Sequence, residues 1–194
     1  IDGADIKNLT LSGANILAYG ELSAGAVVGY GEGGCSITSC TVIDSQICSY
    51  TSSGIAGYLD DDSSIRGCTV TGSSIGSISY EGTTLYGIYS GGIVGAGDDD
   101  IDIIGCAVTD CQIDAEEKAG GIVGYVDEHN AIGYCSVTRC EINAQYDEVD
   151  GIAGIAGDGS TIDYCKVADC EISGGDYVGG IAGYLYYAPA ISCC

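Results

Sequence analysis

Methionine, tryptophan and phenylalanine are absent from this chain of 194 residues, which has one proline and one histidine. A core without these large side chains has to be built from Ile, Val, Ala, Leu and Cys in narrow layers. Lys and Arg number 5 against 28 Asp and Glu, for a formal net charge of −23. Nucleic-acid and anionic-membrane surfaces need clustered cations, so both classes are excluded. No apolar run reaches the roughly 18 to 20 residues that a membrane span requires.

Hydrophobic residues, glycine and cysteine are plentiful by contrast. The hydrophobic fraction is 46%, and the chain has 33 Gly and 12 Cys. Disordered chains are poor in hydrophobic residues, so we expect a folded protein. The chain does not begin with Met, and we expect a processed product or a piece of a longer protein.

A four-residue glycine signature occurs six times. In every copy the last glycine lies eleven residues before a cysteine, and an Ile stands three residues before that cysteine. In five copies a Val follows the cysteine by two residues, a small residue by five and an Ile by seven. The signatures are AVVG at 26–29, GIAG at 54–57, GIVG at 92–95, GIVG at 121–124, GIAG at 151–154 and GIAG at 180–183.

The apolar spacing of 3, 2, 3 and 2 predicts short strands joined by corners. A step of two keeps two side chains on one face of a strand, and a step of three turns the chain so that the next pair also points inward. We therefore predict an all-β protein, a right-handed parallel β-solenoid of about six to seven coils of roughly 28–30 residues, filling 1–194 as one domain. Changes in length fall in one loop of the coil, and the longest insertion predicts a protruding loop at 76–90. We expect the signature glycines to serve a tight bend or a positive φ.

These repeats resemble the GLUG-repeat family, which is named for its Gly-Leu-x-Gly signature. GGIVGY at 120–125 and GGIAGY at 179–184 are similar to its core, and so is the Ile-x-x-Cys-x-Val that follows. Members of the family are repeat regions of bacterial secreted and cell-surface proteins, including adhesin-like proteins and regions that accompany IgA-specific metallopeptidases. The resemblance implies an extracellular bacterial β-solenoid and brings no catalytic residues.

Most cysteines fall into two columns of the predicted solenoid. The first contains Cys40, Cys68, Cys106, Cys135, Cys165 and Cys194, and the second contains Cys111, Cys140 and Cys170. Coils about 4.8 Å apart allow disulfides, but inward-pointing side chains favour buried thiols that act as small hydrophobes. Disulfides are expected first at the off-register Cys35, Cys48 and Cys193, and a link between subunits at Cys193 or Cys194. One histidine and no C-x-x-C disfavour a zinc or thioredoxin-type site.

Acidic residues also align after the signatures. A solvated acidic face is one interpretation. The other is a calcium site, the only cofactor that the pattern suggests, because Ca²⁺ would relieve the repulsion between stacked carboxylates. Its candidate ligands are Asp60, Asp62, Asp98, Asp100 and Asp127.

Tyrosines recur after the signature at Tyr30, Tyr58, Tyr125 and Tyr184. Such a ladder covers a sheet, or it binds a sugar or a partner. Tyr80, Tyr86 and Tyr89 in 76–90 are the candidate binding residues, since function tends to lie on long loops of rigid scaffolds.

Catalysis has little support, because there is one histidine and neither GxSxG nor HExxH occurs. We expect a non-enzymatic, secreted or cell-surface structural or adhesive protein whose partner is itself, stacked end to end in a filament. The alternative is a surface module that recognises a glycan or a protein through 76–90 and the tyrosine ladder.

Overall fold

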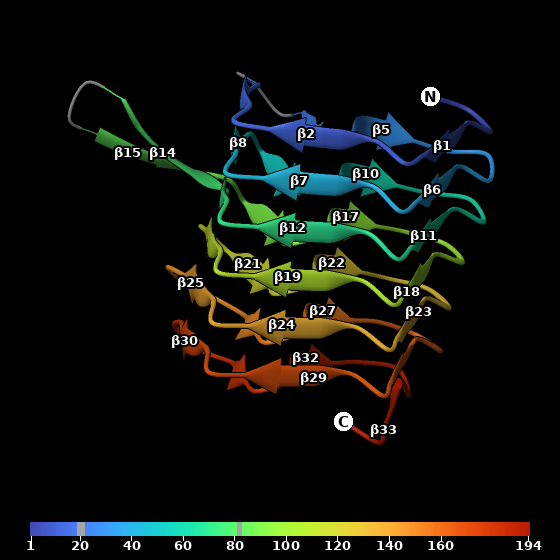
Figure 1. The fold of residues 1–194 in the computed structure, drawn as a ribbon. Helices are drawn as coiled ribbons and strands as arrows, with labels where there is room; N and C mark the ends of the chain where they lie inside the picture. Colours follow the sequence, from blue (N-terminus) through green and yellow to red (C-terminus); the bar gives the residue numbers. More distant parts are fainter. Residues whose placement is uncertain (19–21, 81–82) are drawn as a thin grey trace.

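The computed structural model describes residues 1–18, 22–80 and 83–194, without the side chains at 79, 80 and 83. This part of the chain contains 33 short strands and no helix. Accordingly, it contains no helix that could span a membrane. The strands stack coil upon coil into a rod (Figure 1).

Each complete coil consists of five strands. In the second coil these are β6 (Ser36–Thr38), β7 (Thr41–Ile43), β8 (Gln46–Cys48), β9 (Thr51–Ser53) and β10 (Ala56–Leu59). Each strand pairs in parallel with its equivalents in the coils above and below, which produces five sheets along the rod, called here sheets A to E.

Sheet A contains β1 (Asp5–Lys7), β6, β11 (Ser64–Arg66), β18 (Asp102–Ile104), β23 (Ala131–Gly133), β28 (Thr161–Asp163) and β33 (Ala190–Ser192). Sheet B contains β2 (Thr10–Ser12), β7, β12 (Thr69–Thr71), β19 (Ala107–Thr109), β24 (Ser136–Thr138) and β29 (Lys166–Ala168). Sheet C contains β3 (Asn15–Leu17), β8, β13 (Ser74–Ile75), β20 (Gln112–Ala115), β25 (Glu141–Ala144) and β30 (Glu171–Ser173). Sheet D contains β4 (Ser23–Gly25), β9, β16 (Tyr89–Gly91), β21 (Lys118–Gly120), β26 (Val149–Asp150) and β31 (Val178–Gly179). Sheet E contains β5 (Val28–Gly31), β10, β17 (Val94–Gly97), β22 (Val123–Val126), β27 (Ala153–Ala156) and β32 (Ala182–Leu185).

The register of the strands confirms the predicted parallel β-solenoid. Ile37 pairs with Ile65, and Ile65 pairs with Ile103, so the isoleucines of sheet A form a column. Val70 and Val108 continue a second column in sheet B, and these side chains are fully buried. The repeated apolar positions are therefore the core, as their spacing predicts.

The signature glycines allow close approach rather than positive φ, which corrects one alternative of the sequence interpretation. None of them has a positive φ. A Cβ on Gly121 would lie 2.1 Å from the carbonyl oxygen of Gly151 in the next coil. Positive φ occurs instead at other turns, among them the two corners that flank sheet B, where Gly105 and Asp110 are examples.

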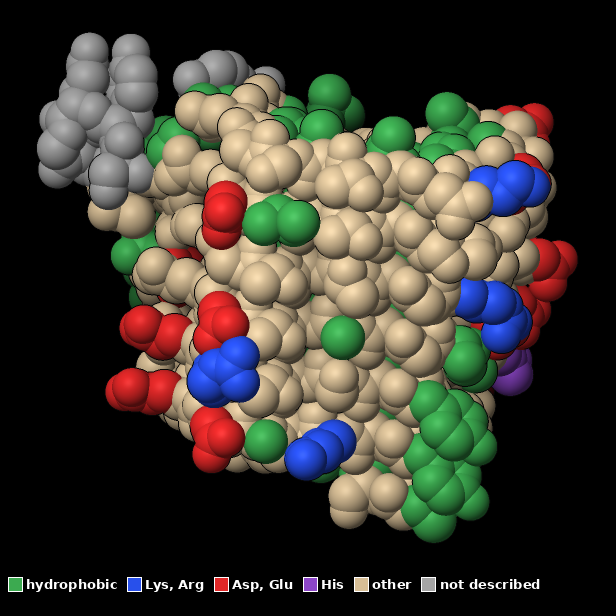
Figure 2. Space-filling model, in the orientation of Figure 1, with side chains coloured by type: hydrophobic (Ala, Val, Ile, Leu, Met, Phe, Trp, Pro, Cys, Tyr) green, Lys and Arg blue, Asp and Glu red, His purple; other side chains and the backbone are tan. Residues whose placement is uncertain are grey.

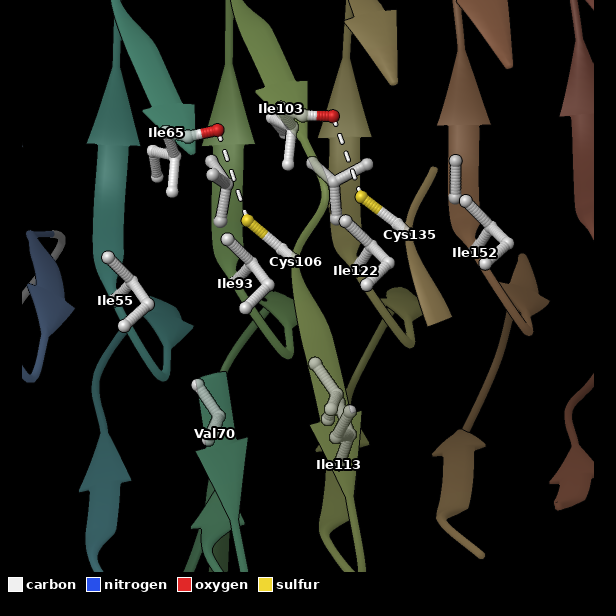
Figure 3. Packing of buried hydrophobic residues seen from close by; sticks show 14 of the residues in the cluster. Ile55, Ile65, Val70, Ile93, Ile103, Cys106, Ile113, Ile122, Cys135 and Ile152 are labelled. Carbon is white, nitrogen blue, oxygen red and sulfur yellow. Dashed lines mark hydrogen bonds between the residues drawn. The ribbon is translucent and has the colours of Figure 1, made fainter. Parts of the chain in front are cut away.

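The cysteine columns carry hydrogen bonds as well as hydrophobic contact. The backbone N–H of Cys40 donates to Sγ of Cys68 in the next coil at 3.3 Å. The thiols of Cys106 and Cys135 donate to the carbonyls of Ile65 and Ile103 at 3.9 and 3.5 Å (Figure 3). Serine does the same at an equivalent corner, where the N–H of Ser45 donates to Oγ of Ser73 at 3.1 Å. Cysteine and serine thus link successive coils at the corners, where the strands are interrupted.

Candidate binding site

One segment breaks the regularity of the coils. β14 (Ser77–Tyr80) and β15 (Thr83–Tyr86) pair as an antiparallel hairpin, while the strands of sheets A to E pair in parallel. The hairpin extends beyond the side of the rod between β13 and β16 (Figure 1). The rest of the predicted protruding loop returns to the coil, because Tyr89 and Ser90 belong to β16 of sheet D.

The base of the hairpin is closely packed against the coils. Gly76 has a φ of +84°, and a Cβ there would lie 1.9 Å from the carbonyl oxygen of Asp114. The N–H of Gly87 donates to the carbonyl of Gly76 at 2.7 Å and closes the base. Because glycine alone fits this approach and this φ, the hairpin leaves the rod in a defined direction.

Asp114 joins the hairpin to sheet C. Its carboxylate accepts hydrogen bonds from Oγ of Ser77 at 2.5 Å, Nε2 of Gln112 at 2.9 Å and Nδ2 of Asn143 at 3.1 Å. The residue is only 5% exposed, and burial of a carboxyl group is unfavourable without hydrogen bonds. The three donors supply these bonds in place of water. The same contacts orient the amides of Gln112 and Asn143 at the surface of the sheet.

A polar groove of about 700 Å³ lies between this surface and the hairpin. Its volume is within the range of ligand sites. Amide, hydroxyl and carboxylate groups dominate the lining, which consists of Gln46, Ser74, Ser77, Ile78, Thr84, Tyr86, Gln112, Asp114, Ala115, Glu141, Asn143, Ala144 and Gln145.

A second, more apolar groove of about 330 Å³ also borders the hairpin. Leu17, Ile78, Leu85 and Ile88 are among the residues that line it. Ile78 pairs with Leu85 across the hairpin and Ser77 pairs with Tyr86. Of the hairpin side chains, Ser77 and Thr84 line the polar groove alone and Leu85 lines the apolar groove alone, while Ile78 lines both.

The predicted tyrosines are not brought together at one site. Tyr86 is 39% exposed and borders both grooves. Tyr89 lies in β16, where its ring stacks on Tyr125 at 5.7 Å and Nζ of Lys118 lies 5.1 Å from its centre. The side chain of Tyr80 lies outside the described residues.

The tyrosine ladder is discontinuous. Tyr30 and Tyr58 stack at 5.5 Å, but the next residue in that register is Ala96. Further down the rod, Tyr186 covers a similar interruption, where its hydroxyl donates to Asp127 and lies 3.3 Å from the hydroxyl of Tyr125. The ladder mainly covers sheet E.

The proposed calcium ligands do not converge into a metal site within the described part of the chain. No group of three or more His, Cys, Asp or Glu side chains there could hold an ion. The hydroxyl of Tyr58 donates to Asp98 at 3.3 Å, and burial raises the pKa of Asp98. The neighbouring charge of Asp60 raises the pKa of Asp61. Figure 2 shows acidic side chains at the edges of a largely uncharged broad face. Calcium binding at Asp60, Asp62, Asp98, Asp100 and Asp127 stays a prediction.

All twelve cysteines are free thiols in the structure. Cys35 and Cys48 are buried, and the thiol of Cys35 donates to the carbonyl of Glu32 at 3.1 Å. Cys193 and Cys194 are exposed. Oxidation at any of the four stays a prediction.

The polar face of sheet C was missed by the sequence interpretation. Gln112 and Asp114 flank Ile113, and Glu141 and Asn143 flank Ile142, so they point away from the core at paired positions. The sequence could have indicated this polar face, because polar residues stand on both sides of the isoleucine that follows a column cysteine by seven residues, as at Ile113 and Ile142. Only the folded hairpin makes this face one wall of a groove.

Comparison with known proteins gives little further information. No family model matches the sequence, and no curated protein matches it. A crystal structure from Bacteroides ovatus, provisionally described as an immunoglobulin A1 protease, matches with a TM-score of 0.48 and 17% identity over 97% of this chain and 67% of that one. A likeness at this level carries no argument about the chain. The fold itself defines the class of this chain, which is a parallel β-solenoid repeat protein.

Proposed function

We propose that this chain is a non-enzymatic structural and adhesive repeat protein displayed outside a bacterial cell, whose contact surface is the hairpin and its grooves. The observation that carries the proposal is the hairpin at 77–86, which departs from the parallel coils and borders two grooves. A regular rod holds such an insertion at a defined position.

We propose the extracellular placement on the resemblance of the repeats to those of bacterial secreted and cell-surface proteins. The rod itself is held by repeated backbone pairing and a buried aliphatic core. We propose membership of the GLUG-repeat family on the same residues that carry the resemblance, namely the six signatures and the cysteine that follows each of them. The strand register supports this assignment, since signature valines and alanines pair in successive coils, as Ala56 does with Val94.

The test is attachment of the purified chain to a printed array of glycans and extracellular proteins. The variant replaces residues 77–86 by Asn-Gly, a turn that closes a two-residue hairpin. Asn15→Ala, on the outer face of β3, is the control. We expect binding by the full chain and by the control, and none by the shortened variant. Equal binding by all three proteins, or binding by none, contradicts the proposal. End-to-end stacking through Cys193 or Cys194 stays a prediction, which sedimentation in oxidising and reducing buffers tests.

A further inference from the structure

We propose that the polar groove binds an uncharged, hydroxyl-rich glycan chain that lies along the rod axis between the hairpin and sheet C. This inference rests on the proposed function, and it adds the chemical class of the ligand.

The groove offers many hydrogen-bonding groups. Of its thirteen lining residues, all but Ile78, Ala115 and Ala144 carry a hydroxyl, amide or carboxylate group. The side-chain amides of Gln46 and Gln145 line it without a hydrogen bond to any described residue. An amide offers two donors and an acceptor, which match the adjacent hydroxyl groups of a sugar.

The polar groups are arranged as a row along the rod. Gln46 pairs with Ser74, Ser74 with Gln112, and Gln112 with Glu141 in successive coils of sheet C. The row therefore repeats at the strand spacing of about 4.8 Å, close to the rise of one sugar in an extended glycan. A polymer of sugars can thus place about one sugar against each coil.

A peptide fits this groove less well. The floor is formed by the face of β13, β20 and β25, each of which pairs on both sides, so the floor offers no free strand edge to a peptide backbone. Three small or aliphatic residues are few anchors for peptide side chains. The ring of Tyr86, at the border, is suited to the apolar face of a sugar.

Charge selects the kind of glycan. Within the described part of the chain, no Lys or Arg lines the groove, whereas Asp114 and Glu141 do. The whole chain also has a formal charge of −23, which repels anions. Glycans built from uronic acids, sialic acid or sulfated sugars are therefore disfavoured.

Asp114 is a positioning residue. Its carboxylate holds the amides of Gln112 and Asn143 through the bonds to Nε2 and Nδ2 described above. The amide oxygen of Gln112 then remains available to the ligand, whereas that of Asn143 accepts from Oγ of Ser173. Because both side chains are already held, little side-chain freedom is lost on binding.

The first experiment is titration calorimetry of the full chain with neutral gluco-, xylo- and manno-hexasaccharides. Gln112→Ala and Asn143→Ala each remove one amide from the groove, and Asn15→Ala removes an amide of the same sheet outside it. We expect each groove variant to weaken binding about tenfold, the effect of one lost hydrogen bond to a buried partner. Each also lowers the melting temperature, because Asp114 loses one of its three donors, so binding is measured well below it. We expect Asn15→Ala to change neither. No binding by any neutral hexasaccharide, or equal affinity in all variants, overturns the inference.

The second experiment tests charge. Glu141→Gln keeps the shape of the groove and removes a charge, while Glu171→Gln makes the same change outside it. We expect Glu141→Gln to keep the affinity for the neutral sugar and to improve binding of a galacturonic acid hexamer, and Glu171→Gln to change neither. A wild-type protein that prefers the galacturonate hexamer overturns the inference. If the array instead shows hairpin-dependent binding of a protein, the proposed function stands and the glycan assignment fails.

Discussion

Buried polar groups occur at the corners of the coils and in sheet D. Those at the corners have hydrogen-bond partners in the neighbouring coil, whereas the carboxyl group of Asp150 in sheet D has none among the described residues. At the corners, Ser45 and Cys68 accept N–H groups from the preceding coil and donate to carbonyls. In sheet D, Asp150 is 0% exposed, and neither of its carboxylate oxygens has a hydrogen-bond partner among the described residues. The corner groups are satisfied because the neighbouring coil repeats the matching position, whereas Asp150 occurs once in its column and has no such partner.

The position of Asp150 explains its isolation. In the register of sheet D it lies between Gly120 and Gly179, in a column that is otherwise glycine or serine. Its carboxyl group lies against the backbone at Gly179 and Gly183. Burial raises the pKa of Asp150 to about 9. The backbone N–H groups of Gly183 and Gly179 act in the opposite direction, but neither is placed to form a hydrogen bond with the carboxyl group. Asp150 is therefore protonated at neutral pH.

The largest expected effect comes from placing a second carboxyl group where the solenoid has no space for it. Val137 is fully buried, and its methyl groups lie close to Gly121. Val137→Asp should cost several kcal/mol and abolish folding, because a buried carboxyl group without partners is strongly unfavourable. Circular dichroism checks this, with the more exposed Thr138→Asp in the same strand as the control. A folded Val137→Asp would show that this column is not core.

Removing the isolated carboxyl group of Asp150 should increase the stability of the protein. Asp150→Gly restores the residue found at Gly91 and Gly120, and it should stabilise the protein by about 4 kcal/mol at pH 7, the cost of keeping this group protonated about three units above its ordinary pKa. Urea unfolding at pH 7 measures the change, and Asp158→Gly is the exposed control. If the stability falls instead, the carboxyl group has a partner that the structure does not show.

The same group sets a pH dependence for the unaltered chain. The folded-state pKa is raised, so stability is greatest below the ordinary aspartate pKa of about 4 and is lost as pH rises towards 9. Between pH 5 and pH 7 the loss should be about 3 kcal/mol. The raised pKa values of Asp61 and Asp98 act in the same direction. Unfolding curves at several pH values measure the slope, which should flatten in Asp150→Gly, and a stability maximum near pH 8 would refute this account.

The smallest expected effect comes from removing a hydrogen bond at a corner of the coil, the one between the N–H of Cys40 and Sγ of Cys68. Cys68→Ala removes the acceptor of the Cys40 N–H and should destabilise the chain by about 1–2 kcal/mol. Cys68→Ser should recover part of this loss, since serine occupies the equivalent role at Ser73. Equal stability of the two variants would indicate that the thiol acts by volume alone.

The repeated part of the fold was predictable because it is encoded by spacing. Ile37, Val42 and Ile47 recur with the same intervals, and their alternation identifies inward positions without tertiary information. Sheet D was not predicted, because its strands lie in the segment of variable length and have sequences as different as Thr-Ser-Ser, Lys-Ala-Gly and Val-Asp, which share no apolar period. The site was predicted only as the segment 76–90. Its polar wall comes from coils distant in sequence.

The sequence by itself determined the columns of the core, the corners and the place of the insertion, since these follow from local intervals of two and three residues. Only the tertiary structure decided what the glycines and polar residues do. Gly121 is required by a backbone in the next coil, and Asp114 orders a groove through Ser77 and Asn143. Asp150 is isolated because the neighbouring coils have glycine at its position. These roles depend on contacts between coils, which the spacing within one repeat does not contain.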